Sequence, residues 1–424
     1  MDLVVKNGRL IDPARNIDTI ANVIIRDGKI QSIGGATSTA GPDLPVVDAA
    51  GLVVAPGFLD IHVHLREPGT EEAETIATGG NAAVAGGFTA VASMPNTKPP
   101  NDNPSITQYI ISQAQRSSPA RVFPIGAITK EQKGETLAEI GEMFEAGIVG
   151  ISDDGKPVMD SQLFRRALEY ARMFGMPVIQ HCEDLQLSRG GVMHEGMYST
   201  RLGLKGIPAA AEETIVSRDL ILAQLTGSKY HVAHLSTRRA VEMVREAKAN
   251  DLKVTAEVTP HHFTLTDAAV ADYNTNAKMN PPLRTAEDVA AIIQGLSDGT
   301  IDAIASDHAP HHINLKMLEF DRAPFGIIGL ETAVGLALTK LQLSITRLIE
   351  LFSTNPQKIV RVAPWGLFEG SVADLTLLDL NRNWMFDVNR SRSRSRNSPF
   401  HGWPLKGKAV ATIVGGRVVY EDRG

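Results

Sequence analysis

Residues 53–66 read VVAPGFLDIHVHLR, and the fold assignment starts from this stretch. Its first part is mostly apolar, which is typical of a strand buried on both faces of a parallel sheet. We predict one strand over residues 53–62, closed by His62-Val63-His64. Because side chains alternate along a strand, both imidazoles lie on one side and are able to chelate one metal ion.

Outward from this stretch, short β-rich runs alternate with longer segments of helical composition. The predicted strands cover residues 53–62, 88–94, 122–127, 148–152, 177–180, 231–233, 253–258 and 303–305. The predicted helices between them include 71–85, 136–146, 161–174, 209–225, 237–249 and 285–296. Eight strand–helix units in about 300 residues predict a (β/α)8 TIM-type barrel, with a doubly wound open sheet as the structural alternative.

The two ends of the chain have a different pattern from the middle. Short apolar runs flank turn signals at both ends, at Asp27-Gly28 near the start and at Gly415-Gly416 near the finish. We therefore predict that residues 1–54 together with 363–424 form a small β-domain. Residues 55–362 would then form the catalytic barrel.

Composition limits the class of protein. The 424 residues are 43% hydrophobic and carry a net charge of −6, so they give no reason to expect a nucleic-acid partner. Cys182 is the only cysteine, which fits a reducing compartment, and we expect a cytoplasmic protein. The first residues show no signal-peptide pattern and no apolar stretch is long enough to span a membrane, so we expect neither secretion nor membrane insertion.

Metal-binding residue types follow five of the predicted strands. They are His62 and His64 after the first, Asp153 and Asp154 after the fourth, His181 after the fifth, His234 after the sixth, and Asp307 and His308 after the eighth. In a barrel these strand ends meet at one rim, where the fold places its chemistry. Four histidines with two carboxylates exceed the needs of one tetrahedral zinc and suit two divalent ions that share a carboxylate. We predict two zinc ions per chain, with manganese, cobalt or iron as alternatives.

Several motifs resemble those of the amidohydrolase superfamily, and the His-x-His-x-Arg form of residues 62–66 resembles the dihydroorotases. The resemblance extends over essentially the whole chain, through MPNT at 94–97, SDDG at 152–155, HCE at 181–183, VAHLS at 232–236, EVTPHH at 257–262, NPPLR at 280–284, SDHAPH at 306–311 and NSPF at 397–400. The related hydantoinases and allantoinases usually carry a carboxylated lysine at the fourth strand. Residues 147–152 contain no lysine, which favours the long-chain, bacterial class I dihydroorotases.

The resemblance implies a metal-dependent cyclic amidohydrolase that interconverts N-carbamoyl-L-aspartate and L-dihydroorotate in de novo pyrimidine (UMP) biosynthesis. It implies the metal ligands His62, His64, Asp154, His181, His234 and Asp307, with Asp154 as the bridge. A metal-bound hydroxide would attack the ring amide carbonyl, and Asp307 would act as general acid/base.

Substrate binding is predicted from charge and from the same resemblance. Substrate and product both keep a carboxylate beside the ring carbon, and the planar guanidinium of Arg66 matches a carboxylate bidentately. The resemblance implies that the other substrate-binding residues are His64, Asn96, Asn280, His311 and the backbone of Phe325 and Gly326. One departure from the family pattern lies beside this set. Residues 312–320 read HINLKMLEF where dihydroorotases of this branch commonly show acidic residues followed by lysine, which bears on the conformation of the 312–324 loop and on partner contacts.

Other motifs receive structural interpretations. We expect His261 and His262 to support the site rather than ligate metal, and Cys182 to be a small buried side chain. The Ser/Arg alternation over residues 390–396 is similar to RNA-associated tracts, but we interpret it as an exposed strand or loop of solvated arginines.

Two rival functions remain open at the level of sequence. A hydantoinase or allantoinase would share the barrel and the metals but not the need for Arg66 and Asn96. A catalytically silent scaffold would have lost metal ligands, whereas all six positions are filled here. Besides the small-molecule substrate, we consider two partners, a second copy of the chain in a homodimer and an aspartate transcarbamoylase.

Overall fold

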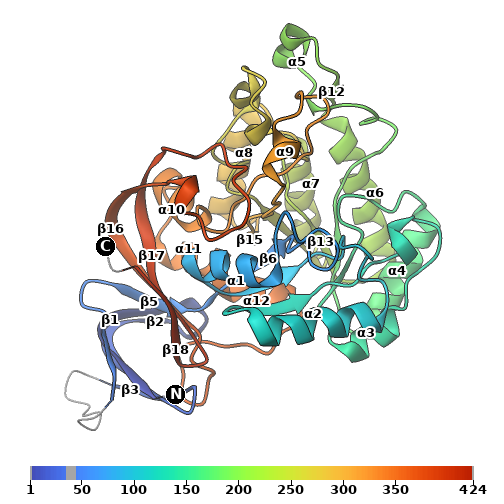
Figure 1. Ribbon diagram of the computed structural model, residues 1–424. Coiled ribbons are helices and arrows are strands. Elements are labelled where there is room, and N and C mark those ends of the chain that lie inside the picture. The colour runs from blue at the N-terminus through green and yellow to red at the C-terminus, as the bar shows by residue number, and fades with distance from the viewer. Residues whose placement is uncertain (1, 35–43, 423–424) are drawn as a thin grey trace.

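The computed structural model describes residues 2–34 and 44–422, which form an α/β architecture (Figure 1). Strands from both ends of the chain lie in one sheet. In spatial order they are β18 (Arg417–Glu421), β17 (Pro404–Val414), β16 (Leu375–Met385), β5 (Val53–Pro56), β1 (Leu3–Asp12), β2 (Ile17–Arg26) and β3 (Lys29–Gly34), with β4 (Val46–Asp48) also paired to β1. Asp27 and Gly28 join β2 to β3 with φ of 49° and 75°, as the predicted hairpin requires.

The central strands form two parallel sheets. One contains β6 (Phe58–Val63), β7 (Phe88–Ser93) and β8 (Arg121–Pro124). The other contains β9 (Ile151–Ser152), β10 (Val178–Gln180), β13 (Tyr230–Val232), β14 (Val254–Val258) and β15 (Ala303–Ile304). Parallel bridges link the two sheets at both edges, Gly126 with Ile151 and Val63 with His308. The short pair β11 (Met193–His194) and β12 (Gly206–Ile207) stands apart.

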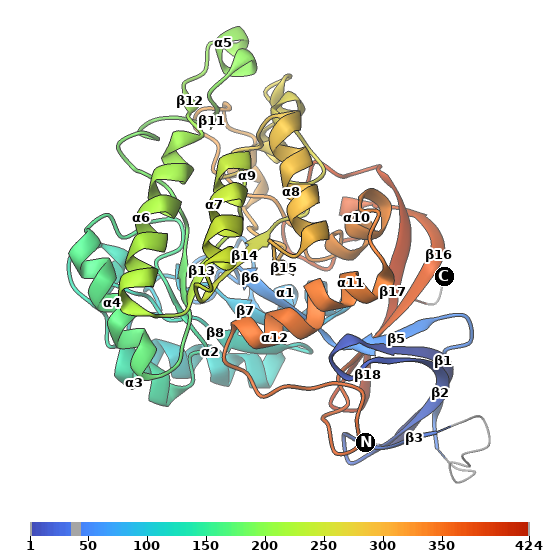
Figure 2. The ribbon, with the colours of Figure 1, turned by 180° about the vertical axis from the view of Figure 1, so that it is seen from behind.

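The helices of the described residues are α1 (Ile76–Ala85), α2 (Pro104–Ser117), α3 (Ile140–Ala146), α4 (Ser161–Met173), α5 (Met197–Leu202), α6 (Ala210–Thr226), α7 (Arg238–Ala249), α8 (Ala286–Asp298), α9 (Ile313–Lys316), α10 (Ala333–Lys340), α11 (Ile345–Ile349) and α12 (Asn355–Ile359). Most of the longer ones lie around the outside of the parallel strands, whereas α5 lies away from them (Figures 1 and 2). The single-turn elements are η1 (Pro13–Arg15), η2 (Lys130–Gln132), η3 (Asp267–Val270), η4 (Thr275–Ala277), η5 (Glu350–Thr354) and η6 (Val388–Arg390).

Local sequence explains why these helices start and pack where they do. In α8 the side chains of Thr285 and Asp288 form a reciprocal capping box, which satisfies the free N–H groups of the first turn. In α4 the residues Phe164, Ala167, Leu168 and Ala171 are buried, at the spacing that places one helical face against the strands. Each crossover helix is thus held to the outside of the parallel strands by an apolar face.

The prediction of a single strand over residues 53–62 was wrong. The chain leaves the terminal sheet at the end of β5 and enters the central sheet at the start of β6, with Gly57 between them. The N–H of Gly57 donates to Asp374, and its carbonyl accepts from Trp365 Nε1 at 2.9 Å. A Cβ on this residue would lie 2.2 Å from Thr89 Oγ1, so only glycine fits the crossing between the two sheets.

The interior of the central strands is apolar on the side opposite the site. Leu59, Ile61, Ala90, Ala92 and Ala303 belong to one buried cluster inside the strands. Polar residues follow at the ends of these strands. Because the strands pack through this apolar cluster, the positions of their ends are fixed. In the part of the chain that the structure describes, no helix has the length and hydropathy needed to cross a membrane.

Candidate metal centre and active site

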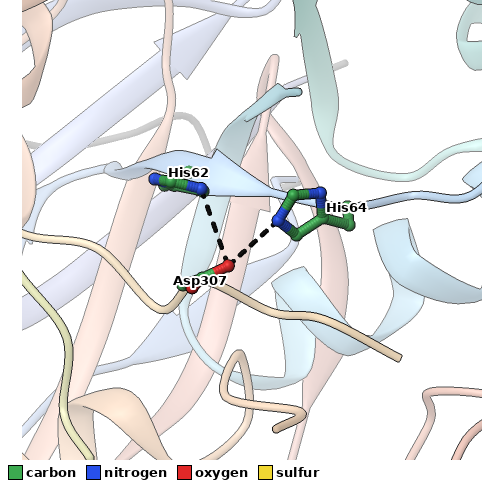
Figure 3. A group of neighbouring side chains, drawn as sticks. All are labelled: His62, His64 and Asp307. Carbon is green, nitrogen blue, oxygen red and sulfur yellow. Dashed lines mark hydrogen bonds and ion pairs between the residues drawn. The ribbon is translucent and has the colours of Figure 1, made fainter. Parts of the chain in front are cut away.

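Six side chains from five strand ends converge on one buried centre. The Oδ1 atom of Asp154 lies 3.4 Å from His62 Nε2, 3.5 Å from His234 Nε2 and 3.8 Å from His181 Nδ1, while its Oδ2 atom lies 3.5 Å from His64 Nε2. Asp307 Oδ1 lies 3.0 Å from His64 Nε2 and 3.6 Å from His62 Nε2 (Figure 3). The structure therefore brings together all six predicted ligands, with Asp154 within 4 Å of all four imidazoles.

The two adjacent aspartates at the fourth strand have different surroundings. Asp154 points into the centre, whereas Asp153 accepts hydrogen bonds from the backbone N–H groups of Ile128 and Thr129 and from the Thr129 hydroxyl. Asp153 thus holds the turn after β8 in place. His308 likewise points away from the centre, since its Nε2 lies 3.1 Å from Glu74 Oε2.

Three site residues have backbone conformations that side chains with a Cβ rarely adopt. Arg66, His234 and Asp307 have φ of 62°, 31° and 45°. Such left-handed conformations cost roughly 1–3 kcal/mol each and persist where the surrounding structure enforces them. Each residue lies just beyond a strand, so the strained turn directs its side chain back toward the centre.

The atoms at the centre fit a divalent cation. His62 Nε2 and Asp154 Oδ1 are buried and make no hydrogen bond to any described residue, although they face each other. The triads His62, His64, Asp307 and His62, Asp154, His234 each have ligand atoms within 4.8 Å of one another. Buried lone pairs that face each other without a proton donor are satisfied by a cation, and imidazole with carboxylate is a donor set that zinc and related ions accept.

Electrostatics in the cluster are dominated by its own charges. Burial would raise the pKa of Asp154, but the charge of His62 and the close approach of the His234 and His62 imidazoles outweigh it and hold that pKa far below its usual range. Burial would lower the pKa of His62, yet the charges of Asp307, Asp154 and Glu257 raise it well above its ordinary value. The carboxylates are therefore ionised at neutral pH, as metal ligands must be.

A cavity of about 220 Å³ opens beside the cluster. Its lining includes five of the six predicted ligands and every residue predicted to bind substrate, namely His64, Arg66, Asn96, Asn280, His311, Phe325 and Gly326. His62 does not line it and lies fully buried behind the other ligands. Substrate in this cavity would thus contact both the metal ligands and the polar side chains that line it.

Arg66 and Asn96 provide the polar side of the cavity. The Arg66 Nε atom donates to the carbonyl of Pro310 at 3.1 Å, and its Nη2 lies 3.4 Å from His311 Nε2. Burial lowers the pKa of Arg66 to about 10, partly opposed by Asp307 and Asp154, so the guanidinium stays charged at neutral pH. Asn96 Oδ1 lies 2.8 Å from His64 Nδ1, which orients that imidazole.

The loop that carries Phe325 and Gly326 forms another part of the cavity lining. The Phe325 carbonyl lies 2.7 Å from His311 Nε2, and the Gly326 N–H donates to the Lys278 carbonyl. These two backbone groups are engaged within the protein. Any pairing of this segment with the amide edge of a ring would use its other backbone atoms.

Sequence reasoning missed two carboxylates behind the ligands. Glu257 Oε1 lies 2.6 Å from His62 Nδ1, and its Oε2 lies 3.2 Å from His231 Nε2. Glu183 Oε2 lies 2.8 Å from His181 Nε2. Carboxylates in these positions fix the tautomer and orientation of metal-binding histidines. The available signal for Glu257 was a charged residue inside an otherwise apolar strand, and for Glu183 its place two residues after a ligand.

The remaining predicted residues lie around the site. His261 and His262 are buried, with rings 4.6 Å apart, and His262 Nε2 lies 3.0 Å from the Pro281 carbonyl. The charges of Asp307 and His234 act on the pKa of His261, but His261 belongs to neither ligand triad. Cys182 is buried, and burial raises the pKa of its thiol well above the ordinary value.

The fold and the site define a metal-dependent cyclic amidohydrolase. The structure is similar to that of an L-hydantoinase (dihydropyrimidinase) from Arthrobacter aurescens, with a TM-score of 0.89 and 27% identity over 99% of this chain and 96% of that one. Residues 51–240 match the family described as Dihydro-orotase-like. The dihydroorotase of Solibacter usitatus (strain Ellin6076) is 56% identical over 420 residues, 98% of this chain and 97% of that protein. The dihydroorotase of Geobacter metallireducens (strain ATCC 53774 / DSM 7210 / GS-15) is 51% identical over 425 residues, 99% and 100% of the two chains. The chain belongs to the dihydroorotase family.

Proposed function

We propose that this enzyme catalyses the reversible cyclisation of N-carbamoyl-L-aspartate to L-dihydroorotate in pyrimidine biosynthesis. The observation that carries the proposal is the pairing of a six-ligand metal centre with a cavity that is lined both by five of those ligands and by Arg66. A centre of this kind suits amide hydrolysis in general. The buried guanidinium adds a requirement for a substrate carboxylate, which dihydroorotate has and dihydrouracil lacks.

We infer two zinc ions per chain, which His62, His64, Asp154, His181, His234 and Asp307 would hold, with Asp154 as the ligand that both would share. When bound, the ions supply Lewis acidity that activates water and polarises the amide carbonyl. Residues 147–152 lack a lysine, and the side chain that enters the centre just after this segment is Asp154, whose Oδ1 lies 3.5 Å from His234 Nε2. This supports assignment to the dihydroorotases without that modification.

Substrate orientation would come from the polar side chains that line the cavity beside the metal ligands. Arg66 would bind the carboxylate bidentately with His311 beside it, and Asn96 and Asn280 would contribute from the same lining. Asn280 Nδ2 already donates to Glu183 Oε2 at 2.8 Å, so its amide is held in one orientation. Fixed donors of this kind place the ring carbonyl against the metal centre before reaction.

Asp307 would carry the proton. Burial would raise its pKa, but the charge of His62 and the hydrogen bond from His64 outweigh burial and place that pKa below its usual range. The carboxylate is therefore ionised and ready to accept a proton from the attacking water. It would then deliver that proton to the leaving ring nitrogen, and in the biosynthetic direction it would take the proton from the ureido nitrogen.

The architecture that we infer for this chemistry is a closed (β/α)8 barrel with a small β-domain. The bridges Gly126–Ile151 and Val63–His308 support closure, because they join the two parallel sheets at both edges. The sharing of one sheet by strands from both chain ends supports the small domain. Since β5 ends at Pro56, the division falls at Gly57, slightly later than residue 54.

A substrate comparison tests the proposal. The purified, zinc-loaded chain would be assayed for hydrolysis of dihydroorotate, dihydrouracil and allantoin side by side. We expect a preference for dihydroorotate of at least about 100-fold in kcat/KM, the range expected when a buried charge is left unpaired. A preference for dihydrouracil or allantoin would refute the substrate assignment while keeping the enzyme class. The hypotheses of a cytoplasmic location, a homodimer and a complex with aspartate transcarbamoylase need separate tests, the last two by sedimentation of the chain alone and with that enzyme.

A further inference from the structure

The Ser/Arg alternation over residues 390–396 has two different faces. Arg390, Arg392 and Arg394 are exposed, as predicted, whereas Ser391, Ser393 and Ser395 are buried. We call residues 391–397 the strap. It follows η6 without helix or strand of its own, and its alternate side chains face the protein interior. The inward residues, rather than the arginines, therefore need explanation.

Each inward serine of the strap holds a different segment near the active site. Ser391 Oγ donates to Glu331 at 2.5 Å, and Ser395 Oγ donates to the Ala73 carbonyl at 2.7 Å. Ser393 Oγ donates to Glu74, the same carboxylate that pairs with His308 Nε2. The strap thus joins the segments that follow β6 and β15.

Asn397, at the end of the strap, makes three hydrogen bonds to two segments of the cavity wall. Its Nδ2 donates to the carbonyls of Ala309 at 2.9 Å and Gly326 at 3.0 Å. Its Oδ1 accepts from the His311 N–H at 3.1 Å. The residue is 1% exposed, so water does not replace these partners if the side chain is removed.

The two segments that Asn397 joins are also linked directly, because the Ala309 N–H donates to the Ile327 carbonyl at 2.9 Å and His311 Nε2 lies 2.7 Å from the Phe325 carbonyl. A Cβ on Gly326, whose φ is +150°, would lie 2.5 Å from the Ala309 carbonyl oxygen and 2.7 Å from His311 Cδ2. The two segments therefore approach backbone to backbone, with no room for a side chain of Gly326 between them. Two carbonyls that face each other repel unless a donor lies between them. The Asn397 amide donates to both the Ala309 and the Gly326 carbonyls, and the Lys316 ammonium donates to the Gly326 carbonyl as well, at 3.2 Å.

We propose that Asn397 is a positioning residue for substrate binding, which acts by fixing the distance between Ala309–His311 and Phe325–Gly326 across the cavity wall. This inference rests on the proposed function, since it assigns the wall to the substrate. Asn397 itself does not line the cavity, and none of its three bonds involves a metal ligand. Its influence should thus fall on substrate binding, not on the metal centre.

The test compares Asn397→Ala with Ser395→Ala in the full-length, zinc-loaded enzyme. Ser395 is the matched control because it is a buried strap residue whose hydroxyl also bonds a carbonyl, but away from the cavity. Two measurements are made on each variant: hydrogen exchange of peptides that cover 309–312 and 325–328, and KM and kcat for dihydroorotate. We expect Asn397→Ala to speed exchange in both peptides and to raise KM roughly 10-fold with little change in kcat, as loss of uniform binding does. Ser395→Ala should change neither quantity.

Each outcome shows either that Asn397 positions the cavity wall for the substrate or that it only stabilises the fold. Unchanged exchange in both peptides would overturn the inference, and so would faster exchange with unchanged KM. An equal rise of KM in Ser395→Ala would also overturn it, because the effect would then belong to strap stability in general. If Asn397→Ala does not fold, Asn397→Ser keeps a smaller hydroxyl and receives the same measurements. If the wild-type enzyme prefers another ring, the proposed function fails, yet the exchange data and the KM for that ring still decide the role of Asn397.

Discussion

Substituting Glu257 by glutamine should weaken metal binding without unfolding the protein. The carboxylate lies behind His62, 2.6 Å from Nδ1, and both side chains are fully buried. The pKa of Glu257 is lowered to about 2, because the charge of His62 and the hydrogen bonds from His231 and His62 outweigh burial, so the carboxylate is ionised at neutral pH. An ionised acceptor at Nδ1 leaves the Nε2 lone pair directed at the metal centre.

The size of the effect follows from the change in hydrogen-bond type. Hydrogen bonds to a charged partner contribute about 1.5–3 kcal/mol and neutral ones about 0.5–1.5 kcal/mol, so Glu257→Gln loses roughly 1–1.5 kcal/mol, or about 10-fold in affinity. Loss of the negative charge also makes His62 easier to deprotonate, which assists metal binding and partly offsets the loss. The expected result thus lies near the lower end of the roughly 10–100-fold cost of removing such partners.

The assay is competition for zinc between the protein and a chromogenic chelator, with thermal unfolding of the metal-free protein measured in parallel. Glu212→Gln is the matched control, because Glu212 is a buried glutamate that accepts from the N–H groups of Ser236 and Thr237 and contacts no ligand side chain. It should lower stability and leave zinc affinity unchanged. If Glu257→Gln binds zinc as tightly as the wild type, the assigned role of the carboxylate is wrong.

Three further outcomes can be measured on the same protein. Arg66→Met should raise KM for dihydroorotate by roughly 10–100-fold while leaving slow turnover of dihydrouracil unchanged, and equal losses on both rings would contradict carboxylate recognition. Burial and the nearby Lys278 lower the pKa of Lys316 to about 7, so the unfolded chain binds more protons than the folded one between about pH 7 and 10. The free energy of unfolding should therefore rise with pH across this window through Lys316, and Lys316→Met should lose that rise; parallel stability curves for the two proteins would refute the assignment. Removal of metal by a chelator should abolish activity and lower the melting temperature, and added zinc should restore both, whereas activity that survives complete metal removal would contradict the metal dependence.

The sequence was informative where chemistry and strand periodicity coincide. His62 and His64 share one side of a strand end, and His181, His234 and Asp307 each follow a short apolar run, so a barrel model places them at one rim. The same logic failed at residues 53–62. An apolar run buried throughout does not show where the chain changes sheets, and the only local sign was the pair Pro56-Gly57.

The residues that hold the ligands in place were not predictable in the same way. Glu257 lies 195 positions from His62, and Asn397 lies 71 positions from Gly326, so no local spacing connects either pair. The Ser/Arg tract shows a related difficulty. Its composition suggested solvated arginines, and the arginines are indeed the exposed residues. The hydrogen bonds to other segments, however, come from the buried serines, whose partners lie on loops remote in sequence.

The difference between the two groups of residues has a physical origin. A metal ligand must be one of a few residue types with a lone pair, and a strand end restricts where it stands, so two local requirements identify it. A supporting residue needs only to reach the far side of that ligand, which many residue types on many elements can do. Arg284 illustrates the point, because its Nη1 donates to the Ile207 carbonyl and its Nε donates to Ser236 Oγ, which ties the β11–β12 excursion to the segment after His234. Arg284 ends the NPPLR motif at 280–284, and these contacts are with the protein itself. Variants of such residues should therefore alter binding and stability together, and only matched controls of the kind described for Glu257 and Asn397 separate the two effects.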